Sequence, residues 1–544
     1  MYFISFTCIC CIVLCVTKSN AWELPPVELD NHAKDLIPIK ERIFVREFRF
    51  EGNTVISDQA LAARIQEYEY QWITSEELEG IRNRLSLSYL EKGYINSGAL
   101  LEEQTFKDGV VIFRIVEGEL TEIVIKSKGK RRLRDPYIKR QLNARVKSPL
   151  NMGDLRDSLQ LLRQDPNIRR INAEIKPTGI HGKSMLELNL EERYPLHATI
   201  GVDNYRSASI GAERVNAYIS HQNLFGYSDA FNLRYGLTQG GWDHPEFNEF
   251  GDLSASYAFP LNRYGTELEM GTSKTDNTII EEPFEDLDIK SEFESYSLKI
   301  SHPLYRTLFH ELNILVEGEY KESQTFVGSE PFSLFLGNRE GQSVISVLRL
   351  GLDGIIRTKQ QVLAARSVFS FGQDLFGATI NEGNIPDSEF ISWQGQMQYV
   401  RRLGESDNRI IARVNAQLAN EALLSLEQFS LGGISSVRGY RENQFVRDNG
   451  VAGGVELRIG LLRDKLGLNA LEFVPFFDYG EAWSSTGNTA SSETLKSAGL
   501  GLIFNIASRF NAQLYWGHGF REFEVSERDL QDEGLHFSLS YRLL

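Results

Sequence analysis

Two short motifs contain an arginine and an aspartate, residue types that can form a paired contact. Arg438 is followed by a glycine at a candidate loop tip, and Asp478 lies within a strand-like segment. A guanidinium donates two parallel hydrogen bonds to a carboxylate, a geometry that lysine cannot reproduce. We expect such a pair to position a loop rather than to add stability, because buried charges lose their hydration. The candidate site residues are Val437, Arg438, Gly439 and Tyr440 in the first motif and Phe476, Asp478 and Gly480 in the second.

The setting of each motif leaves an alternative for its charged residue. Residues 421–450 form the longest irregular stretch between strong strand patterns, and they contain the first motif. Arg438 could instead be an ordinary solvated loop arginine. Asp478 could instead be a carboxylate near the end of a strand, where it would face water.

From residue 194 to the end of the chain, polar and apolar residues alternate with a period of two. In segment 535–543, for example, Phe537 and Leu539 fall on one face and Ser538 falls on the other. About sixteen segments show this pattern, which is typical of an even-stranded membrane barrel with a lipid-facing wall and a wet lumen. A soluble all-β protein also alternates and is the alternative.

The N-terminus predicts secretion. A short apolar run at 3–16, followed by small residues up to Ala21, indicates a signal peptide at 1–21. The four cysteines of the chain lie in or beside this run, so a lipoprotein signal is the alternative. No later segment has the roughly 18 consecutive apolar residues of a membrane helix. The remaining chain is therefore either soluble or a closed barrel, since only helices and closed barrels satisfy their backbone in lipid.

Composition excludes several classes of function. The chain carries 58 Lys and Arg against 74 Asp and Glu, a net charge of -16, which argues against nucleic-acid binding. Beyond the N-terminal run there is no cysteine for a thiolate catalyst or a zinc-cysteine site. No hydrolase, zinc-protease or nucleotide-binding motif has a plausible setting. We therefore predict no catalytic residues, no metal and no cofactor, and we interpret Glu281 and Glu282 as solvated loop residues.

Residues 43–193 follow a strand-helix-helix-strand-strand order twice, at 43–118 and at 119–193. In the first unit, Thr74 and Glu77 predict a capping box at the start of a helix over 75–92. A strand is expected at 97–104. Two unrelated small α+β domains are the alternative to a repeat.

These features together resemble the two-partner secretion transporters, the TpsB family of hemolysin and adhesin secretion pores. The strand-helix-helix-strand-strand order resembles the POTRA domain, a periplasmic docking module. That superfamily carries a VRGY-type motif on a loop folded into the lumen and an F-x-D-x-G motif on a wall strand, which Val437–Tyr440 and Phe476–Gly480 match. The resemblance implies a mainly β fold: an antiparallel transmembrane barrel of about 16 strands over 194–544, with its lumen loop at 421–450, after two small α+β POTRA-like domains.

The resemblance also implies a function. The chain would be a pore in the bacterial outer membrane, with its POTRA-like domains in the periplasm, and not an enzyme. Its expected partners are a secreted exoprotein that is unfolded in transit, outer-membrane lipid, and the machinery that inserts barrels. A factor that assembles other barrels and a passive porin are the alternatives. Residues 22–42 are predicted to be a proline-bearing linker, which leaves open whether an N-terminal plug helix exists.

Overall fold

The computed structural model describes residues 42–544, except residues 107, 239–250, 282–286, 405, 465–466, 486–491, 507–508 and 526–527. The expected signal peptide and nearly all of the expected linker therefore lie outside the described residues. The chain divides into two compact units. The first includes Gly98–Val116 and the residues up to Tyr89, and the second contains Leu90–Ser97 and Glu117–Leu544.

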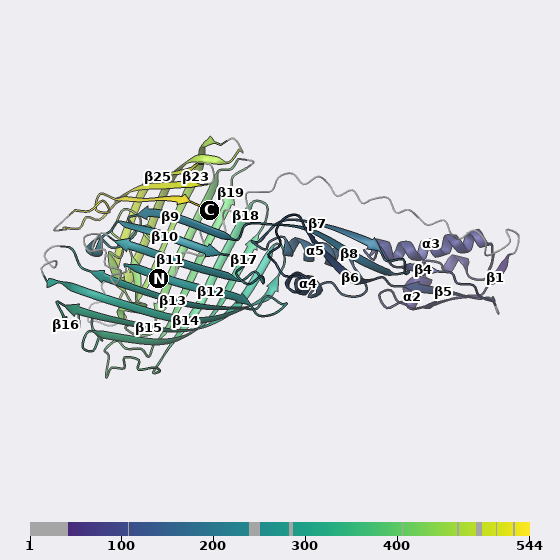
Figure 1. Ribbon diagram of the computed structural model, residues 1–544, viewed down its shortest axis with the longest axis horizontal. Helices are drawn as coiled ribbons and strands as arrows, with labels where there is room; N and C mark the ends of the chain where they lie inside the picture. Colours follow the sequence, from purple (N-terminus) through teal and green to yellow (C-terminus); the bar gives the residue numbers. More distant parts are fainter. Residues whose placement is uncertain are drawn as a thin grey trace. The chain divides into compact units, whose positions relative to one another are not determined.

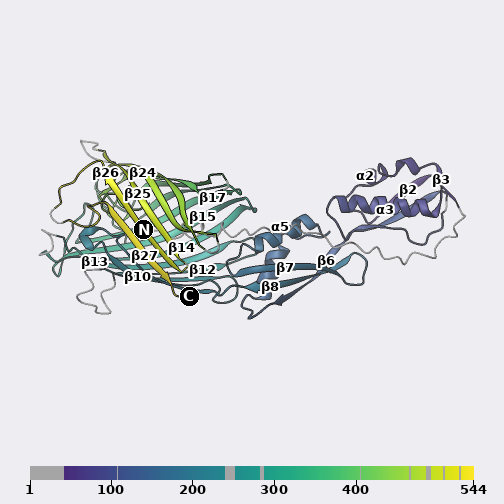
Figure 2. The same cartoon turned by 90° about the horizontal axis from the view of Figure 1, so that it is seen from above.

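The first unit is a small α+β domain (Figures 1 and 2). Helix α3 packs its apolar face inward, because Leu78, Ile81 and Leu85 recur at helical spacing and are buried. The expected capping box begins this helix: the amide of Thr74 donates to the Glu77 carboxylate at 2.7 Å, and the amide of Glu77 donates to the Thr74 hydroxyl at 3.3 Å. The elements are β1 (Ile43–Val45), β2 (Glu47–Glu51), α2 (Asp58–Ala62), β3 (Gln71–Ile73), α3 (Ser75–Glu91), β4 (Gly98–Leu100) and β5 (Val110–Val116).

The strand expected at 97–104 is wrong beyond Leu100, where β4 ends. The side chain of Gln104 takes the place of the missing strand. Its amide nitrogen donates to the carbonyl of Ile112 at 2.8 Å, and its amide oxygen accepts from the Ile112 N–H at 2.8 Å. The Gln104 side chain thus satisfies backbone groups of β5 that would otherwise need a neighbouring strand. The sequence pattern alone predicts such a strand.

The second POTRA-like domain lies within the second unit and has the strand-helix-helix-strand-strand order, without counterparts of β1 and β3. Its sheet has the order β6-β8-β7, with β6 and β8 parallel. Helices α4 and α5 supply Ile138, Leu142 and Leu155 to an apolar core, and the sheet supplies Leu186 and Leu188. The elements are β6 (Glu119–Ser127), α4 (Asp135–Asn143), α5 (Met152–Leu162), β7 (Ile168–Pro177) and β8 (Lys183–Glu192).

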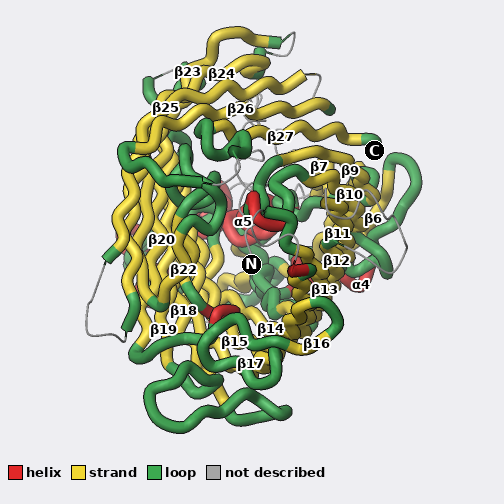
Figure 3. The backbone as a smooth tube through the Cα atoms, turned by 90° about the vertical axis from the view of Figure 1, so that its left-hand side faces the viewer, coloured by secondary structure: helices red, strands yellow, loops and turns green. Residues whose placement is uncertain are grey.

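A closed antiparallel barrel follows, and its closure is made by pairing of the last strand, β27, with the first, β9 (Figures 1 and 3). The expected fold class is confirmed: the described residues form sixteen wall strands and a two-residue extra strand, β16 (Glu330–Pro331). The wall strands are β9 (Leu196–Asp203), β10 (Arg214–His221), β11 (Ala230–Thr238), β12 (Asp252–Pro260), β13 (Glu267–Thr278), β14 (Ile289–Arg306), β15 (His310–Val327), β17 (Gln342–Arg357), β18 (Gln361–Gln373), β19 (Ile391–Arg402), β20 (Arg409–Ala419), β23 (Asn449–Arg463), β24 (Asn469–Trp483), β25 (Glu493–Ile506), β26 (Phe510–Gly519) and β27 (Leu535–Arg542).

The two faces of the wall differ in character. Along β17, Leu348, Leu350 and Leu352 are exposed on the outside, whereas Arg349 between them is buried on the inside. This alternation places apolar side chains outward and charged ones toward the lumen, as a lipid-facing barrel requires. Among the described residues, no helix is both long and apolar enough to cross a membrane.

The turn between β10 and β11 contacts the second POTRA-like domain. The buried Asn167 side chain donates to the carbonyl of Gln222 at 2.7 Å and to the Ser228 hydroxyl at 2.9 Å. The amide of Arg134 donates to the carbonyl of Gly226 at 2.9 Å. Gly226 has φ of 93°, and a Cβ there would meet the Arg134 side chain at 2.8 Å. The close approach therefore favours glycine at this position.

Candidate functional site

The segment between β20 and β23, residues 420–448, folds back into the barrel, and we call it the lumen loop. It carries a small hairpin made of β21 (Phe429–Leu431) and β22 (Phe445–Arg447). In Figure 3, which looks into the barrel, β22 lies inside the ring of wall strands. The sequence predicted this loop at 421–450, whereas its last two residues belong to the wall, since β23 begins at Asn449.

Arg438 of the lumen loop meets Asp478 of β24 through a two-pronged contact. Its Nε donates to Asp478 Oδ2 at 2.7 Å and its Nη2 to Oδ1 at 2.9 Å. The Arg438 amide also donates to Oδ2, at 3.1 Å. The two side chains are 2% and 0% exposed, so neither alternative of a solvated charge describes them. The remaining guanidinium nitrogen, Nη1, donates to Glu456 of β23 at 2.7 Å.

Aromatic rings cover the same guanidinium. The Arg438 Cζ lies 3.7 Å from the centroid of the Phe476 ring and 5.1 Å from that of Tyr515. A ring face attracts a cation, and the attraction grows when water is excluded. Phe476 of the second motif therefore contributes a surface for Arg438, while Asp478, two residues later on the same face of β24, contributes the carboxylate.

The other motif residues fit the loop against the wall. Gly439 has φ of 89°, its amide donates to His536 Nε2 at 3.2 Å, and a Cβ there would meet the backbone of Gly517 at 2.7 Å. Tyr440 donates its hydroxyl to the carbonyl of Lys496 at 2.8 Å. These contacts join the loop to the strands at the end of the chain as well as to β24.

Val437 and Gly480 form the apolar part of the contact between the loop and the wall. Val437 is fully buried in a small cluster with Leu431 and Ala452. Gly480 of β24 leaves room for that cluster, because a Cβ there would lie 2.3 Å from Leu431 and 3.0 Å from Val437. All seven residues singled out from the sequence thus lie in one continuous contact between the loop and the wall.

Further charged residues extend the site beyond the motifs. Arg413 of β20 approaches Asp478 at 3.5 Å, and Arg458 of β23 approaches Glu456 at 2.7 Å. Sequence reasoning missed Glu456 and Arg458. The available signal was the inward-facing polar position on each strand, but nothing in the local pattern says which inward charges share a contact.

Arg441, next to the first motif, contacts the loop between β26 and β27 and the segment after β13. Its Nε and Nη2 donate to the Asp532 carboxylate at 2.6 and 2.7 Å, and its Nη1 donates to Glu281. The prediction that Glu281 is simply solvated is therefore wrong. Arg441 brings a cation from the lumen loop to Glu281, while Glu282 lies outside the described residues.

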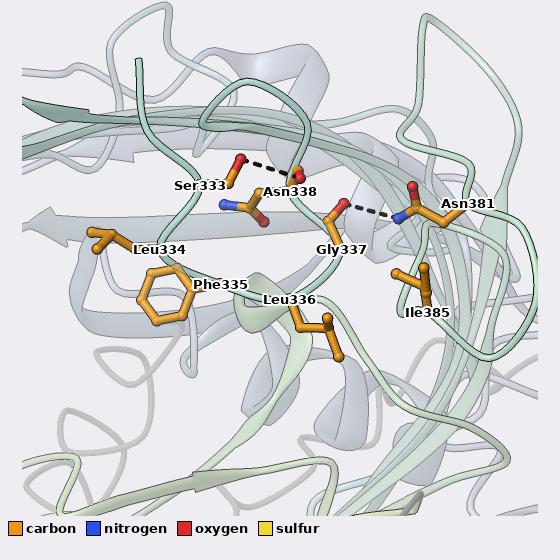
Figure 4. A pocket seen from close by; sticks show the side chains of 8 residues that line it. All are labelled: Ser333, Leu334, Phe335, Leu336, Gly337, Asn338, Asn381 and Ile385. Atoms are coloured by element: carbon orange, nitrogen blue, oxygen red, sulfur yellow. Dashed lines mark hydrogen bonds between the residues drawn. The ribbon is translucent and has the colours of Figure 1, made fainter. Parts of the chain in front are cut away.

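A separate hollow of about 440 Å³ opens on loops outside the lumen, between the residues after β16 and the loop after β18 (Figure 4). Its lining includes Leu334, Phe335 and Leu336, with hydrogen bonds from Ser333 to Asn338 and from Asn381 to Gly337 (Figure 4). None of its eight lining residues is titratable, and none belongs to the two motifs. The lumen loop is therefore the candidate site.

The chain matches known families along most of its length. A family model described as haemolysin secretion/activation protein ShlB/FhaC/HecB matches residues 182–504. The chain belongs to this family. The model of the ShlB-type POTRA domain matches residues 43–118. The resemblance inferred from the two motifs is thereby confirmed at the level of the family.

Members of the ShlB/FhaC/HecB family with similar sequences are named as transporters. The outer membrane transporter CdiB of Dickeya dadantii is 23% identical over 472 residues, which cover 86% of this chain and 81% of the relative. The hemolysin transporter protein ShlB of Serratia marcescens is 21% identical over 458 residues, covering 82% and 78%. The family consists of outer-membrane transporters, so the barrel lies in the outer membrane and the POTRA domains in the periplasm.

Solved structures show the same fold. CdiB from Escherichia coli superimposes with a TM-score of 0.67 at 21% identity, covering 95% of this chain and 93% of that one. BamA from Haemophilus ducreyi, in a form lacking POTRA domains 1–3, superimposes with a TM-score of 0.54 at 12% identity, covering 92% and 100%. The barrel preceded by a POTRA region is thus common to this family and to BamA.

Proposed function

We propose that this chain is a pore that exports one large, unfolded exoprotein of hemolysin or adhesin type from the periplasm to the cell surface. In this proposal the chain has no enzymatic activity, and its other partners are outer-membrane lipid and the machinery that inserts barrels. The observation that carries the proposal is the Arg438–Asp478 contact, in which a buried ion pair ties a loop in the lumen to the wall.

An ion pair such as Arg438–Asp478 suits a loop that must move out of the lumen during export. Ion pairs inside a protein need good geometry to offset the loss of hydration. Inside a wet lumen, the separated charges of Arg438 and Asp478 would regain water, so release costs less than it would in a dry core. The pair therefore acts as a latch that holds the lumen loop in one position until the client displaces it.

Client capture is assigned to the POTRA-like domains. Strand β4 pairs only with Arg114–Val116 of β5. At Ile112, the Gln104 side chain occupies the backbone groups instead. An extended client segment that displaces Gln104 would add to this edge through backbone hydrogen bonds. Strand addition makes few sequence demands, which suits an unfolded client. Holding an amphipathic segment in a groove is the other mode that we consider.

Secretion tests the proposal directly. The chain is co-expressed with a large exported protein that is encoded beside it, if its genome has one, and the culture medium is assayed with the wild type and with Arg438→Ala. Arg528→Ala serves as the control, because that side chain is 78% exposed in a loop. Insertion of each variant is measured by the heat-dependent gel mobility of the barrel.

Each outcome separates the candidate functions. Client in the medium with the wild type and the control, and a loss of it with inserted Arg438→Ala, is the expected result. Secretion that never depends on this chain contradicts the proposal; depletion of other barrels from the membrane would then favour an assembly factor. Steady small-molecule conductance that survives deletion of residues 43–193 would favour a porin. Normal secretion by Arg438→Ala would retain the transporter and exclude the latch.

A further inference from the structure

Glu427, at the start of the lumen loop, forms a second contact with the wall. It ends a short 3-10 helix, Ser425–Glu427, and is 5% exposed. Its Oε1 accepts from Lys321 Nζ of β15 at 2.8 Å and from Arg349 Nη2 of β17 at 2.7 Å. Neither the two sequence motifs nor the Arg438 contact involves any of these residues.

The wall side of this contact is built to receive a carboxylate. Glu319 of β15 accepts from Arg349 Nη2 at 3.0 Å and lies 3.5 Å from Lys321. Arg349 Nη1 donates to the Ser370 hydroxyl at 2.5 Å. Without Glu427, two buried cations would face a single carboxylate. Because a buried charge without a partner is costly, the wall charges balance only when Glu427 is present.

This contact is distant from the Arg438 contact around the barrel. Lys321 and Arg349 belong to β15 and β17, whereas Asp478 belongs to β24. In the strand order of the wall, β18, β19, β20 and β23 lie between β17 and β24. The lumen loop is therefore tied to two separate sectors of the wall.

The residues around Glu427 are also fixed by hydrogen bonds to the wall. Gln417 of β20 donates its side-chain amide to the carbonyls of Glu427 and Asp448, at 2.8 and 3.0 Å. The Asp448 carboxylate accepts from the amides of Leu423 at 2.9 Å and Ser485 at 2.8 Å. We call residues 421–428 together with Asp448 the stem of the lumen loop.

Apolar packing supports the stem. Leu423 and Leu424 are each 1% exposed and pack with Ile345 and Val347 of β17 and with Phe390. Apolar contacts of this kind are lost only at the cost of exposing the surfaces to water. The remaining loop, residues 429–447, carries Arg438, and we call it the arm.

We propose that Glu427 is a positioning residue that fixes the stem to β15 and β17, so that only the arm turns when the lumen opens. The arm loses the Arg438–Asp478 contact in this movement, while Glu427 keeps Lys321 and Arg349. The proposal deepens the proposed function and rests on its latch, but it makes a separate statement about which part of the loop stays in place.

Distances between paired spin labels test the proposal on the full-length inserted chain. One label is placed at Glu421 in the stem or at Asn443 in the arm, both exposed, and the other at the exposed Lys359 in the turn after β17. No cysteine lies beyond position 15, so introduced cysteines are the labelling sites of the barrel. The comparison is made in the wild type, in Arg438→Ala, in Glu427→Gln and in the control Glu389→Gln, whose side chain is exposed.

The stem distance decides the outcome. We expect a narrow distribution in the wild type, in the control and in Arg438→Ala, and a broad one in Glu427→Gln. A stem that broadens in Arg438→Ala, or one that stays narrow in Glu427→Gln, overturns the proposal. If Glu427→Gln fails to insert, Lys321→Gln removes one of the two wall partners of Glu427 and is read by the same criterion. Secretion is assayed on the same variants, so failure of export and failure of the fixed stem are distinguishable.

Discussion

The second POTRA-like domain and the barrel both have buried interiors, yet they are built from opposite kinds of side chain. The domain buries a continuous set of leucines and isoleucines, such as Ile138, Leu142 and Leu188. The barrel lumen buries charges, of which Arg438 and Asp478 are almost completely covered. Both regions exclude solvent from side chains, but the lumen combines its apolar clusters with buried ion pairs, whereas the core of the domain is apolar.

This difference between apolar packing and buried ion pairs indicates which part of the molecule can change its conformation. Apolar contacts are non-directional, and separating them exposes surface that water disfavours. Ion pairs are directional, and separated charges can be rehydrated in a water-filled lumen. The domain interior is therefore suited to a rigid docking module, and the lumen interior to a loop that is held in one position and then released. Four changes break or sharpen this contrast.

The largest expected effect is on the apolar side of the contrast. Leu142→Ala empties a fully buried site in α4, and the free energy of unfolding of the domain should fall by about 2–5 kcal/mol. The matched control is Ile180→Ala, since Ile180 is 60% exposed in the same domain. Limited proteolysis of inserted protein at increasing denaturant measures the difference. Equal resistance of the two variants would contradict the assignment of this core.

A smaller effect is expected where the loop meets the wall without any change in charge. Gly480→Ala places a methyl group 2.3 Å from Leu431, and overpacking of this kind costs about 1–3 kcal/mol. We expect the arm to separate from β24 and the single-channel conductance to rise. Gly318→Ala on β15 is the control, because no heavy atom lies within 4 Å of its added Cβ. Unchanged conductance in Gly480→Ala would show that the contact between the arm and β24 tolerates the methyl group, and it would contradict this prediction.

A smaller effect is expected at the contact between the second POTRA-like domain and the barrel, which we call the joint. Asn167→Ala removes two hydrogen bonds to the turn after β10, at a cost of about 1 kcal/mol. The domain and the barrel should each stay folded, while secretion falls moderately because the domain is less firmly held. Asn172→Ala, at an exposed position of β7, is the control. Secretion of Asn167→Ala at the wild-type level would show that these hydrogen bonds are not needed for export.

The smallest effect concerns a charge outside the lumen. Hydrogen bonds from Lys126 and Lys176, at 2.8 and 2.9 Å, hold the pKa of Glu187 at about 2, below its ordinary value of 4.5. The contribution of this carboxylate to stability is present above pH 4.5 and is lost as the pH falls toward 2. Glu187→Gln should flatten the acid side of the stability profile of the domain. A profile identical to that of the wild type would exclude this contribution.

Much of the fold could be predicted from the sequence because its signals are local. The alternation in 535–543 predicts β27, and Thr74 with Glu77 predicts the start of α3. Residues 97–104 are the exception, because alternation cannot show that Gln104 will satisfy the strand edge with its side chain.

The candidate site divides in the same way. Arg438 and Asp478 are recognisable because each lies in a short motif. Glu427 was missed because nothing near it in the sequence indicates its partners, which are 106 and 78 residues away. Glu281 was interpreted as solvated for the same reason, since its partner Arg441 lies 160 residues further along the chain.

The sequence by itself determined the strand count, the inward and outward faces of the wall, and the identity of one loop arginine and one wall aspartate. These follow from a period of two and from short motifs, which need no knowledge of distant residues. Only the tertiary structure decided which inward charges of the wall meet which residues of the lumen loop. Those contacts depend on barrel closure and strand register, which bring together side chains from strands that are far apart in the chain.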